Sequence, residues 1–129
     1  MDNKEIMHIA MKQSAYDCNC NAEDFIKKEN VTNTSVPNDN ASRYLKLPLI
    51  CHMVSYGTNI VACGREDLLP EIRRFMDSVP NIENCFETPG IYPLNNILKK
   101  ANAEICFMAD YFLPDINEVY GTELSCEYE

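Results

Sequence analysis

Cysteine and histidine are the residues of this sequence that could most readily bind a metal. Cys18 and Cys20 have one residue between them, and the sequence contains only two histidines, His8 and His52. Cysteine pairs in zinc sites normally have two or more residues between them and a second ligand pair at a similar spacing. Because this sequence lacks that pattern, we expect Cys18 and Cys20 to be small side chains at the end of a helix and predict no metal site.

A second arrangement that could do chemistry is a nucleophilic cysteine, Cys85, with His52 as its base. A thiolate forms at neutral pH when a cation or an imidazole lies close to the thiol. Nothing in the spacing along the chain brings Cys85 to His52, so we expect a core cysteine and a strand histidine bonded to a backbone group. An independent thiol enzyme stays an alternative, which uniformly slow alkylation of the cysteines at neutral pH would remove.

The glycines do not form a nucleotide-binding loop, which needs closely spaced glycines at the start of a helix. The four glycines are far apart, at positions 57, 64, 90 and 121. We therefore expect no cofactor in this chain and assign no catalytic residue. Polar groups at strand ends often line a ligand cleft, and four residues near predicted strand ends are our candidates for such a cleft: Tyr56, Glu87, Asp110 and Tyr111.

Composition indicates a folded, acidic protein. The chain has 129 residues, a hydrophobic fraction of 46% and a formal net charge of −9, and one hydrophobic core is enough for this length. Its basic residues come mainly as separate pairs at 27–28, 73–74 and 99–100, which is typical of the solvated sides of helices. A nucleic-acid partner is not expected, because a phosphate backbone would be repelled.

The start of the chain and its cysteines indicate a cytoplasmic protein. Residues 1–5 lack the basic start and apolar run of a secretory signal, and no stretch approaches the roughly 18 apolar residues of a membrane span, so no membrane association is expected. The seven cysteines are an odd number scattered through apolar stretches, which favours free buried thiols over a disulfide framework.

The first half of the chain predicts two helices, a strand and a hairpin. Apolar residues at near-helical spacing predict a helix over residues 2–17 with Asp2 at its start, and a short helix follows Asn21 and ends near Asn30. Alternating β-branched and polar residues predict a strand at 31–36. The strongest β signal is a hairpin of residues 50–56 and 60–63 around Gly57.

The second half predicts two helices and a buried strand. Residues 66–79 repeat apolar side chains every three or four positions, and Pro70 places the start of the regular helix near Leu69. Residues 85–90 are expected to be a short extended segment that ends in a turn, and 93–101 a helix. Residues 104–113 are almost continuously apolar, which predicts a strand covered on both faces.

These elements together predict an α+β fold with a small mixed, mostly antiparallel sheet and about four helices packed on it. We expect a single domain over residues 1–129, with a helical start at 1–30, an α/β core at 31–114 and a tail or linker at 115–129.

Six segments, in this order along the chain, resemble the N-terminal region of bacterial two-part GNAT-family N-acetyltransferases. They are residues 9–15 (IAMKQSA), 22–25 (AEDF), 44–48 (YLKLP), 54–62 (VSYGTNIVA), 85–89 (CFETP) and 105–115 (ICFMADYFLPD). The resemblance extends to residues 124–129, where members of that family continue into a catalytic domain. The loop that holds the pyrophosphate of acetyl-CoA in that second domain has no match in this sequence.

The resemblance implies a degenerate GNAT-like N-terminal domain without activity of its own. Such a chain would be the non-catalytic portion or a truncated form of an N-acetyltransferase, and would support acceptor-substrate binding or domain packing. Acetyl-CoA would be bound only by a second domain. The implied partner is a C-terminal GNAT domain or a second copy of the chain; the alternative is a stand-alone module that binds proteins or small ligands and has no acetyltransferase activity.

Overall fold

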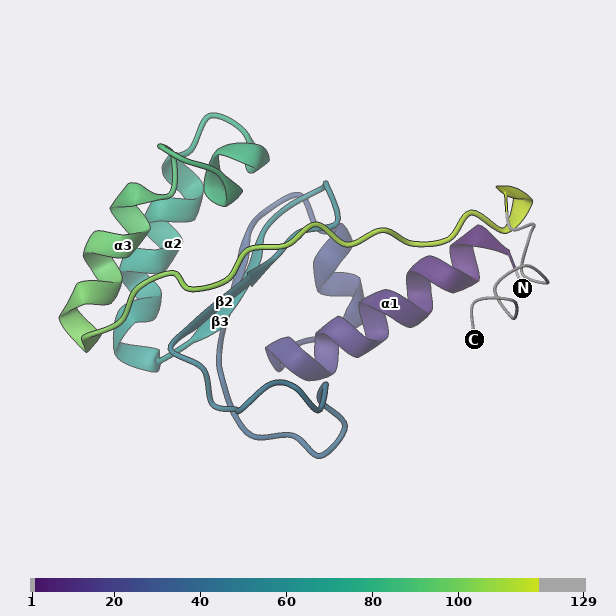
Figure 1. Cartoon of the computed structure of the whole chain (residues 1–129), viewed down its shortest axis with the longest axis horizontal. Helices are drawn as coiled ribbons and strands as arrows, with labels where there is room; N and C mark the ends of the chain where they lie inside the picture. The colour runs from purple at the N-terminus through teal and green to yellow at the C-terminus, as the bar shows by residue number, and fades with distance from the viewer. Residues whose placement is uncertain (1, 119–129) are drawn as a thin grey trace, which may run out of the picture.

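The computed structural model describes residues 2–118 and has an α+β fold (Figure 1). Its regular elements within these residues are three α-helices and three short strands, joined by 3-10 turns. The helices are α1 (Asn3–Cys18), α2 (Leu69–Ser78) and α3 (Tyr92–Leu98), and the strands are β1 (Val31–Thr34), β2 (Cys51–Val54) and β3 (Val61–Gly64). The 3-10 turns are η1 (Ala22–Ile26), η2 (Glu66–Leu68), η3 (Ile82–Phe86), η4 (Lys99–Ala101) and η5 (Ile116–Glu118).

The three strands form one sheet in the order β1-β3-β2, with β3 in the middle. β1 runs parallel to β3, and β2 runs antiparallel to it, so that His52 lies opposite Cys63. All four residues of β3 are buried. The predicted hairpin is thus confirmed, and Gly57 in its turn has a φ of 103°, a conformation that favours glycine.

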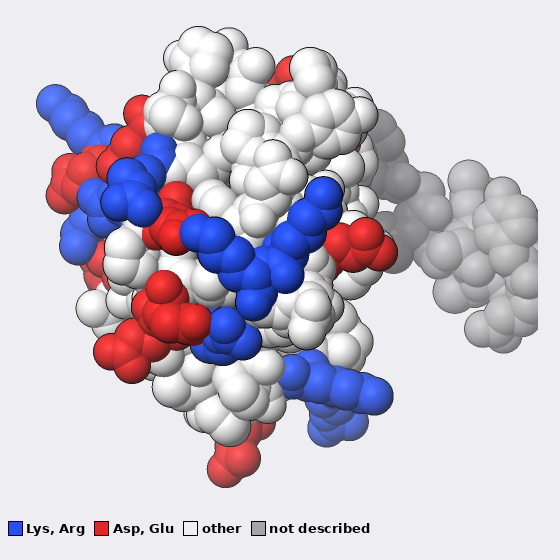
Figure 2. Space-filling model, turned by 90° about the vertical axis from the view of Figure 1, so that its left-hand side faces the viewer, with Lys and Arg blue, Asp and Glu red and all other residues white. Residues whose placement is uncertain are grey.

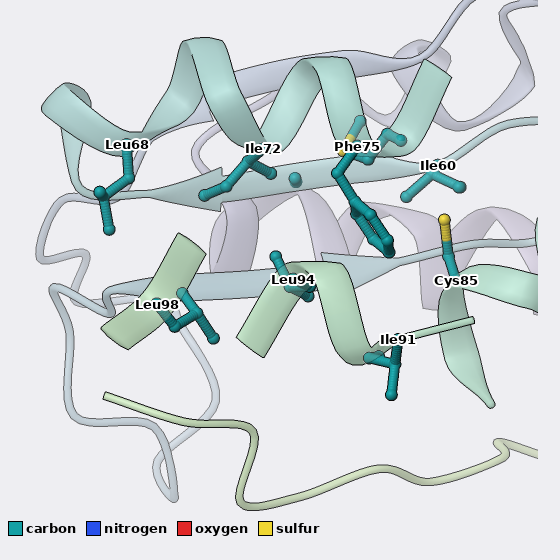
Figure 3. Packing of buried hydrophobic residues seen from close by; sticks show 10 residues of the cluster. Ile60, Leu68, Ile72, Phe75, Cys85, Ile91, Leu94 and Leu98 are labelled. Atoms are coloured by element: carbon teal, nitrogen blue, oxygen red, sulfur yellow. The ribbon is translucent and has the colours of Figure 1, made fainter. Parts of the chain in front are cut away.

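Helices cover both faces of this sheet. Successive side chains of β3 point in opposite directions, and the apolar ones on each face pack against a different set of helices. Ile60 and Ala62 belong to a core shared with α2 and α3, in which Figure 3 shows Phe75 of α2 extending into the space between α2 and α3. The remaining β3 side chains, at 61 and 63, pack with the end of α1 and with η1. The central strand therefore joins two hydrophobic clusters.

Local signals at the helix ends explain where α1 and α2 begin and end. The Asp2 carboxylate accepts a hydrogen bond of 2.8 Å from the backbone N–H of Glu5 at the start of α1, and Asn19 ends this helix in the left-handed conformation. Pro70 lies in the first turn of α2, where its missing N–H costs no hydrogen bond. Both predicted helices, and the predicted start near Leu69, are confirmed.

The prediction of an extended segment at 85–90 was wrong for its first two residues. Cys85 and Phe86 belong to the 3-10 turn η3, whose start is capped by the Asn81 side chain accepting from the N–H of Asn84. An asparagine cap satisfies one of the free N–H groups of a turn. The Asn81 cap thus favours a turn that continues through Cys85 and Phe86 over an extended conformation of these two residues.

The prediction of a buried strand at 104–113 was also wrong. After η4 the chain is extended but forms no ladder, and it crosses in front of the sheet from α3 to the start of α1 (Figure 1). It is held at its two ends, where Asn95 accepts from the N–H of Ile105 and Asn3 accepts from the N–H of Ile116, both at 2.8 Å. Apolar residues form a strand only beside the edge of another strand, and the described fold pairs neither β1 nor β2 with this segment.

The predicted fold class is therefore right at the level of α+β with a small mixed sheet. The described residues form three α-helices rather than about four, because the segment after Asn21 is a 3-10 turn. The sheet has one parallel and one antiparallel pair, so it is not mostly antiparallel. Most of the predicted tail at 115–129 lies outside the described residues. Among residues 2–118, no helix combines the length and the apolar character needed to cross a membrane.

Candidate functional site

Two cysteines and one histidine come together beside the sheet. The thiols of Cys18 and Cys63 and the imidazole of His52, here called the cysteine–histidine cluster, each offer one ligand atom, and these atoms lie within 4.8 Å of one another. The Sγ atom of Cys18 is 3.9 Å from Nδ1 of His52. The cluster joins residues that are 45 positions apart in the sequence, since it includes both Cys18 and Cys63.

Three elements position this cluster. Cys18 is the last residue of α1, and the left-handed Asn19 then turns the chain away. His52 and Cys63 lie directly opposite each other on β2 and β3, and such cross-strand neighbours project from the same face of a sheet. Cys18 and Cys63 are fully buried, whereas His52 is half-buried. Solvent thus reaches the cluster on its histidine side.

Two polar groups lie near Cys63: a backbone carbonyl and the side chain of Asn33. The thiol of Cys63 donates to the backbone carbonyl of Asp17 at 3.8 Å. In the same cross-strand row lies Asn33 of β1, the register partner of Cys63. Its Nδ2 atom is buried and has no hydrogen-bond partner among the described residues. An unpaired buried donor costs free energy that an anionic neighbour could recover.

The three side chains also affect one another electrostatically. The Cys18 thiol, by hydrogen bonding, lowers the pKa of Cys63 against the effect of burial, and His52 and Ser35 lower it further. The same interaction with Cys63, together with burial, raises the pKa of Cys18. These effects favour the ionised form of Cys63 over that of Cys18. By contrast, burial raises the pKa of Cys20 and of Cys51 to about 12.

The structure brings together a different set of cysteine and histidine residues from the two pairings considered from the sequence. Cys20 follows α1 and is only half-buried, and it is not a member of the cluster. Cys85 is buried in the core formed with α2 and α3, whereas His52 is a member of the cysteine–histidine cluster. Cys85 and His52 are therefore not partners, as expected from their spacing. The role of Cys63 was missed, although the predicted hairpin places it within one residue of the position opposite His52.

The four predicted cleft residues have different surroundings in the structure. Tyr56 packs its ring edge-on against Phe25 at a centroid distance of 5.1 Å, and its hydroxyl is 2.7 Å from that of Ser14. The Tyr111 hydroxyl lies 3.5 Å from that of Tyr44. Glu87, which follows η3, and Asp110 both expose their side chains.

Large apolar side chains are exposed along the extended segment that crosses the sheet. Phe107 is 72% exposed and Phe112 is 90% exposed. We call this surface the apolar strip, and its members are Phe107, Met108, Tyr111, Phe112 and Leu113. Cys106, immediately before it, is an exposed free thiol. Contiguous exposed apolar side chains mark interaction surfaces in soluble proteins.

The charged surface and the hollows give weaker signals. Figure 2 shows Lys and Arg interspersed with Asp and Glu on the face it presents. Among the described residues, Arg73 pairs with Asp77 and Lys100 pairs with Glu71. A hollow of about 490 Å³ lies beside β1 and α2, is open to solvent and is lined by residues that include Asn33 and Arg73. A specific small ligand needs a more enclosed pocket.

Comparison with known proteins identifies no relative. No protein family matches the chain, and no curated protein or solved structure is significantly similar to it.

Proposed function

We propose that this chain is the non-catalytic, N-terminal-type portion of a GNAT-family N-acetyltransferase and that the apolar strip packs against a catalytic domain. The observation that carries the proposal is the exposure of Phe107 and Phe112, at 72% and 90%. Such side chains cost free energy in water, about 25 cal/mol for each Å² of apolar surface. The strip lies in the segment 105–115, which is the longest of the six segments that carry the resemblance.

The proposed division of labour assigns the chemistry to the partner. Acetyl-CoA binds to the catalytic domain, and the present chain shapes the acceptor side and contributes packing. Its expected location is the cytoplasm, with neither nucleic acid nor membrane as a partner. We expect no acetyl transfer by this chain alone, and measurable transfer that a point mutation in it abolishes would contradict the proposal.

The alternative is a stand-alone binding module that uses the same strip for self-association. The strip itself favours this alternative as a second candidate, because a chain without a catalytic partner could cover its exposed aromatic rings with those of a second copy. Analytical ultracentrifugation of the isolated chain at micromolar concentration measures its oligomeric state. A dimer that the double variant Phe107→Ser/Phe112→Ser converts to a monomer would support the alternative.

The first experiment is the intact mass of the protein recovered from its native cells. The chain itself has a mass of 14.8 kDa. A native mass of about twice this value, consistent with the size of one further domain, is expected if a catalytic domain is fused to it. If the native mass equals that of the chain, an acetyl-CoA-binding partner must be found to sustain the proposal.

The exposed thiol of Cys106 provides a direct test of docking. A thiol-reactive cross-linker on Cys106 should capture a protein that binds immobilised coenzyme A, and docking should slow alkylation of Cys106. The double variant Phe107→Ser/Phe112→Ser should lose both effects. Tyr92→Ser removes an aromatic ring that is 57% exposed on α3, outside the strip, and is the matched control. A native chain that is monomeric and has no such partner contradicts the proposal.

A further inference from the structure

We propose that Cys18, His52 and Cys63 bind one zinc ion, or another thiophilic divalent ion, that fastens the end of α1 to the sheet. The three side chains come from α1, β2 and β3, and their ligand atoms lie within 4.8 Å of one another. This inference is independent of the proposed docking function, because the strip and the cluster have no residue in common.

The spacing of the ligand atoms fits a tetrahedral ion. Ligands about 2.3 Å (sulfur) and about 2.0 Å (nitrogen) from zinc lie roughly 3.5–3.8 Å from one another. The distance from Cys18 Sγ to His52 Nδ1 is 3.9 Å. Since the remaining separations are at most 4.8 Å, side-chain movements of about 1 Å or less close the site around the ion.

The charge of the site suits its burial. Two thiolates and a neutral imidazole around a divalent cation carry no net charge. The occupied site therefore avoids the free-energy cost of burying an uncompensated charge. The unpaired Nδ2 of Asn33 lies in the same cross-strand row as Cys63. A donor at that place can bond to a metal-bound thiolate, which is how surrounding groups commonly support metal ligands.

The ligand types select the metal. Thiolate and imidazole favour zinc and other soft or borderline ions over magnesium and calcium, which prefer oxygen. Three protein ligands leave the fourth position to water, as in zinc sites with an open coordination position. The half-buried face of His52 gives solvent access to that position.

Cobalt substitution tests the site spectroscopically. Reduced, metal-free full-length chain is titrated with Co²⁺ under anaerobic conditions, and the near-ultraviolet and visible spectra are recorded. The expected result is one equivalent bound, a thiolate-to-cobalt charge-transfer band with the intensity of two thiolates, and the visible bands of a tetrahedral cobalt ion. Added Zn²⁺ should remove these bands by displacement.

Variants assign the ligands. Cys18→Ser, Cys63→Ser and His52→Gln should each weaken Co²⁺ binding by at least about tenfold, and each cysteine variant should reduce the charge-transfer intensity to that of one thiolate. His52→Gln changes a half-buried side chain, so it keeps the site testable if a cysteine variant fails to fold. Cys85→Ser, which alters an equally buried cysteine in the other core, and Cys106→Ser are the controls and should bind like the wild type.

Two results would overturn the proposal. One is a folded, reduced wild-type chain that shows no charge-transfer band at saturating Co²⁺. The other is a band of unchanged intensity and affinity in His52→Gln and in a folded Cys18→Ser variant, because the metal would then be bound elsewhere. Circular dichroism of each variant establishes that it is folded.

Discussion

The Sγ atom of Cys18 lies 3.9 Å from Nδ1 of His52, which joins the last residue of α1 to the edge strand β2. Cys63 of the central strand completes the cluster. This contact lies in the smaller hydrophobic core, on the face of the sheet that α1 covers. The helix α1 contributes few buried side chains to that core. The cysteine–histidine cluster is therefore one of the contacts that attach the end of α1 to the sheet, with or without a metal ion.

The buried thiols should differ strongly from Cys106 in their reactivity. In the native chain, Cys106 is exposed, whereas Cys18, Cys63 and Cys85 are fully buried. We expect Cys106 to be alkylated at the rate of a free thiol and the three buried cysteines to react only on unfolding. Peptide mapping after timed alkylation measures each site. Rapid labelling of Cys63 in folded protein would instead revive the thiol-enzyme alternative.

Asn59 should be one of the most sensitive polar residues. It is 1% exposed, and its amide donates to the backbone carbonyls of Asp24 and Glu29 at 2.7 and 2.9 Å, which fastens η1 to the hairpin. Asn59→Ala leaves these acceptors without a donor, so we expect a loss of about 2–3 kcal/mol in the free energy of unfolding. Urea denaturation measures it. Thr58→Ala, at the exposed neighbouring position, should change stability by less than about 0.5 kcal/mol.

Asp24 should make the stability depend on pH in acid. Burial opposes ionisation of this carboxyl, but the Lys27 ammonium, at 2.7 Å, and the backbone N–H of Asn21, at 3.0 Å, lower its pKa below the ordinary 3.8. The unfolded chain therefore binds a proton more readily than the folded one, so the contribution is present above the unfolded pKa of 3.8 and disappears as the pH falls through the lower folded pKa.

The variant Asp24→Asn tests this sign. At neutral pH it should cost about 1 kcal/mol, because it removes the carboxylate that accepts from the backbone N–H of Asn21, the cap residue of η1. The difference from the wild type should shrink when both are denatured with urea in acid below the folded pKa. A difference that stays constant or grows on acidification would contradict the assignment. Lys27→Met serves as a partial control, since it leaves the bond to Asn21 intact.

Gly64 and Gly57 should respond to alanine for different reasons. A Cβ on Gly64 would overlap the backbone carbonyl oxygen of Ile50, whereas a Cβ on Gly57 meets open space but carries a φ of +103°. We expect Gly64→Ala to destabilise the chain by more than about 3 kcal/mol, since backbone must shift in the buried central strand. Gly57→Ala should cost about 1–2 kcal/mol from strain alone. Thermal denaturation of the two variants should give this order.

Several elements could be predicted because their causes are local. The carboxylate of Asp2 and the ring of Pro70 act on the turn in which they stand, so the starts of α1 and α2 follow from neighbouring residues. The hairpin follows in the same way from apolar strands around Gly57. The hairpin also brings Cys63 close to His52, so two of the three members of the cysteine–histidine cluster were within reach of sequence reasoning.

The tertiary structure alone decided the third member of the cysteine–histidine cluster and the place of the apolar strip. Cys18 meets His52 and Cys63 only because α1 packs on one face of β3, a contact that no spacing along the chain encodes. Residues 104–113 have the apolar character of a buried strand, yet all of them except Ile105 lie exposed on the surface. Their composition favours a covered strand, but a strand forms only beside a free edge of another strand, and only the assembled fold specifies which edges are within reach.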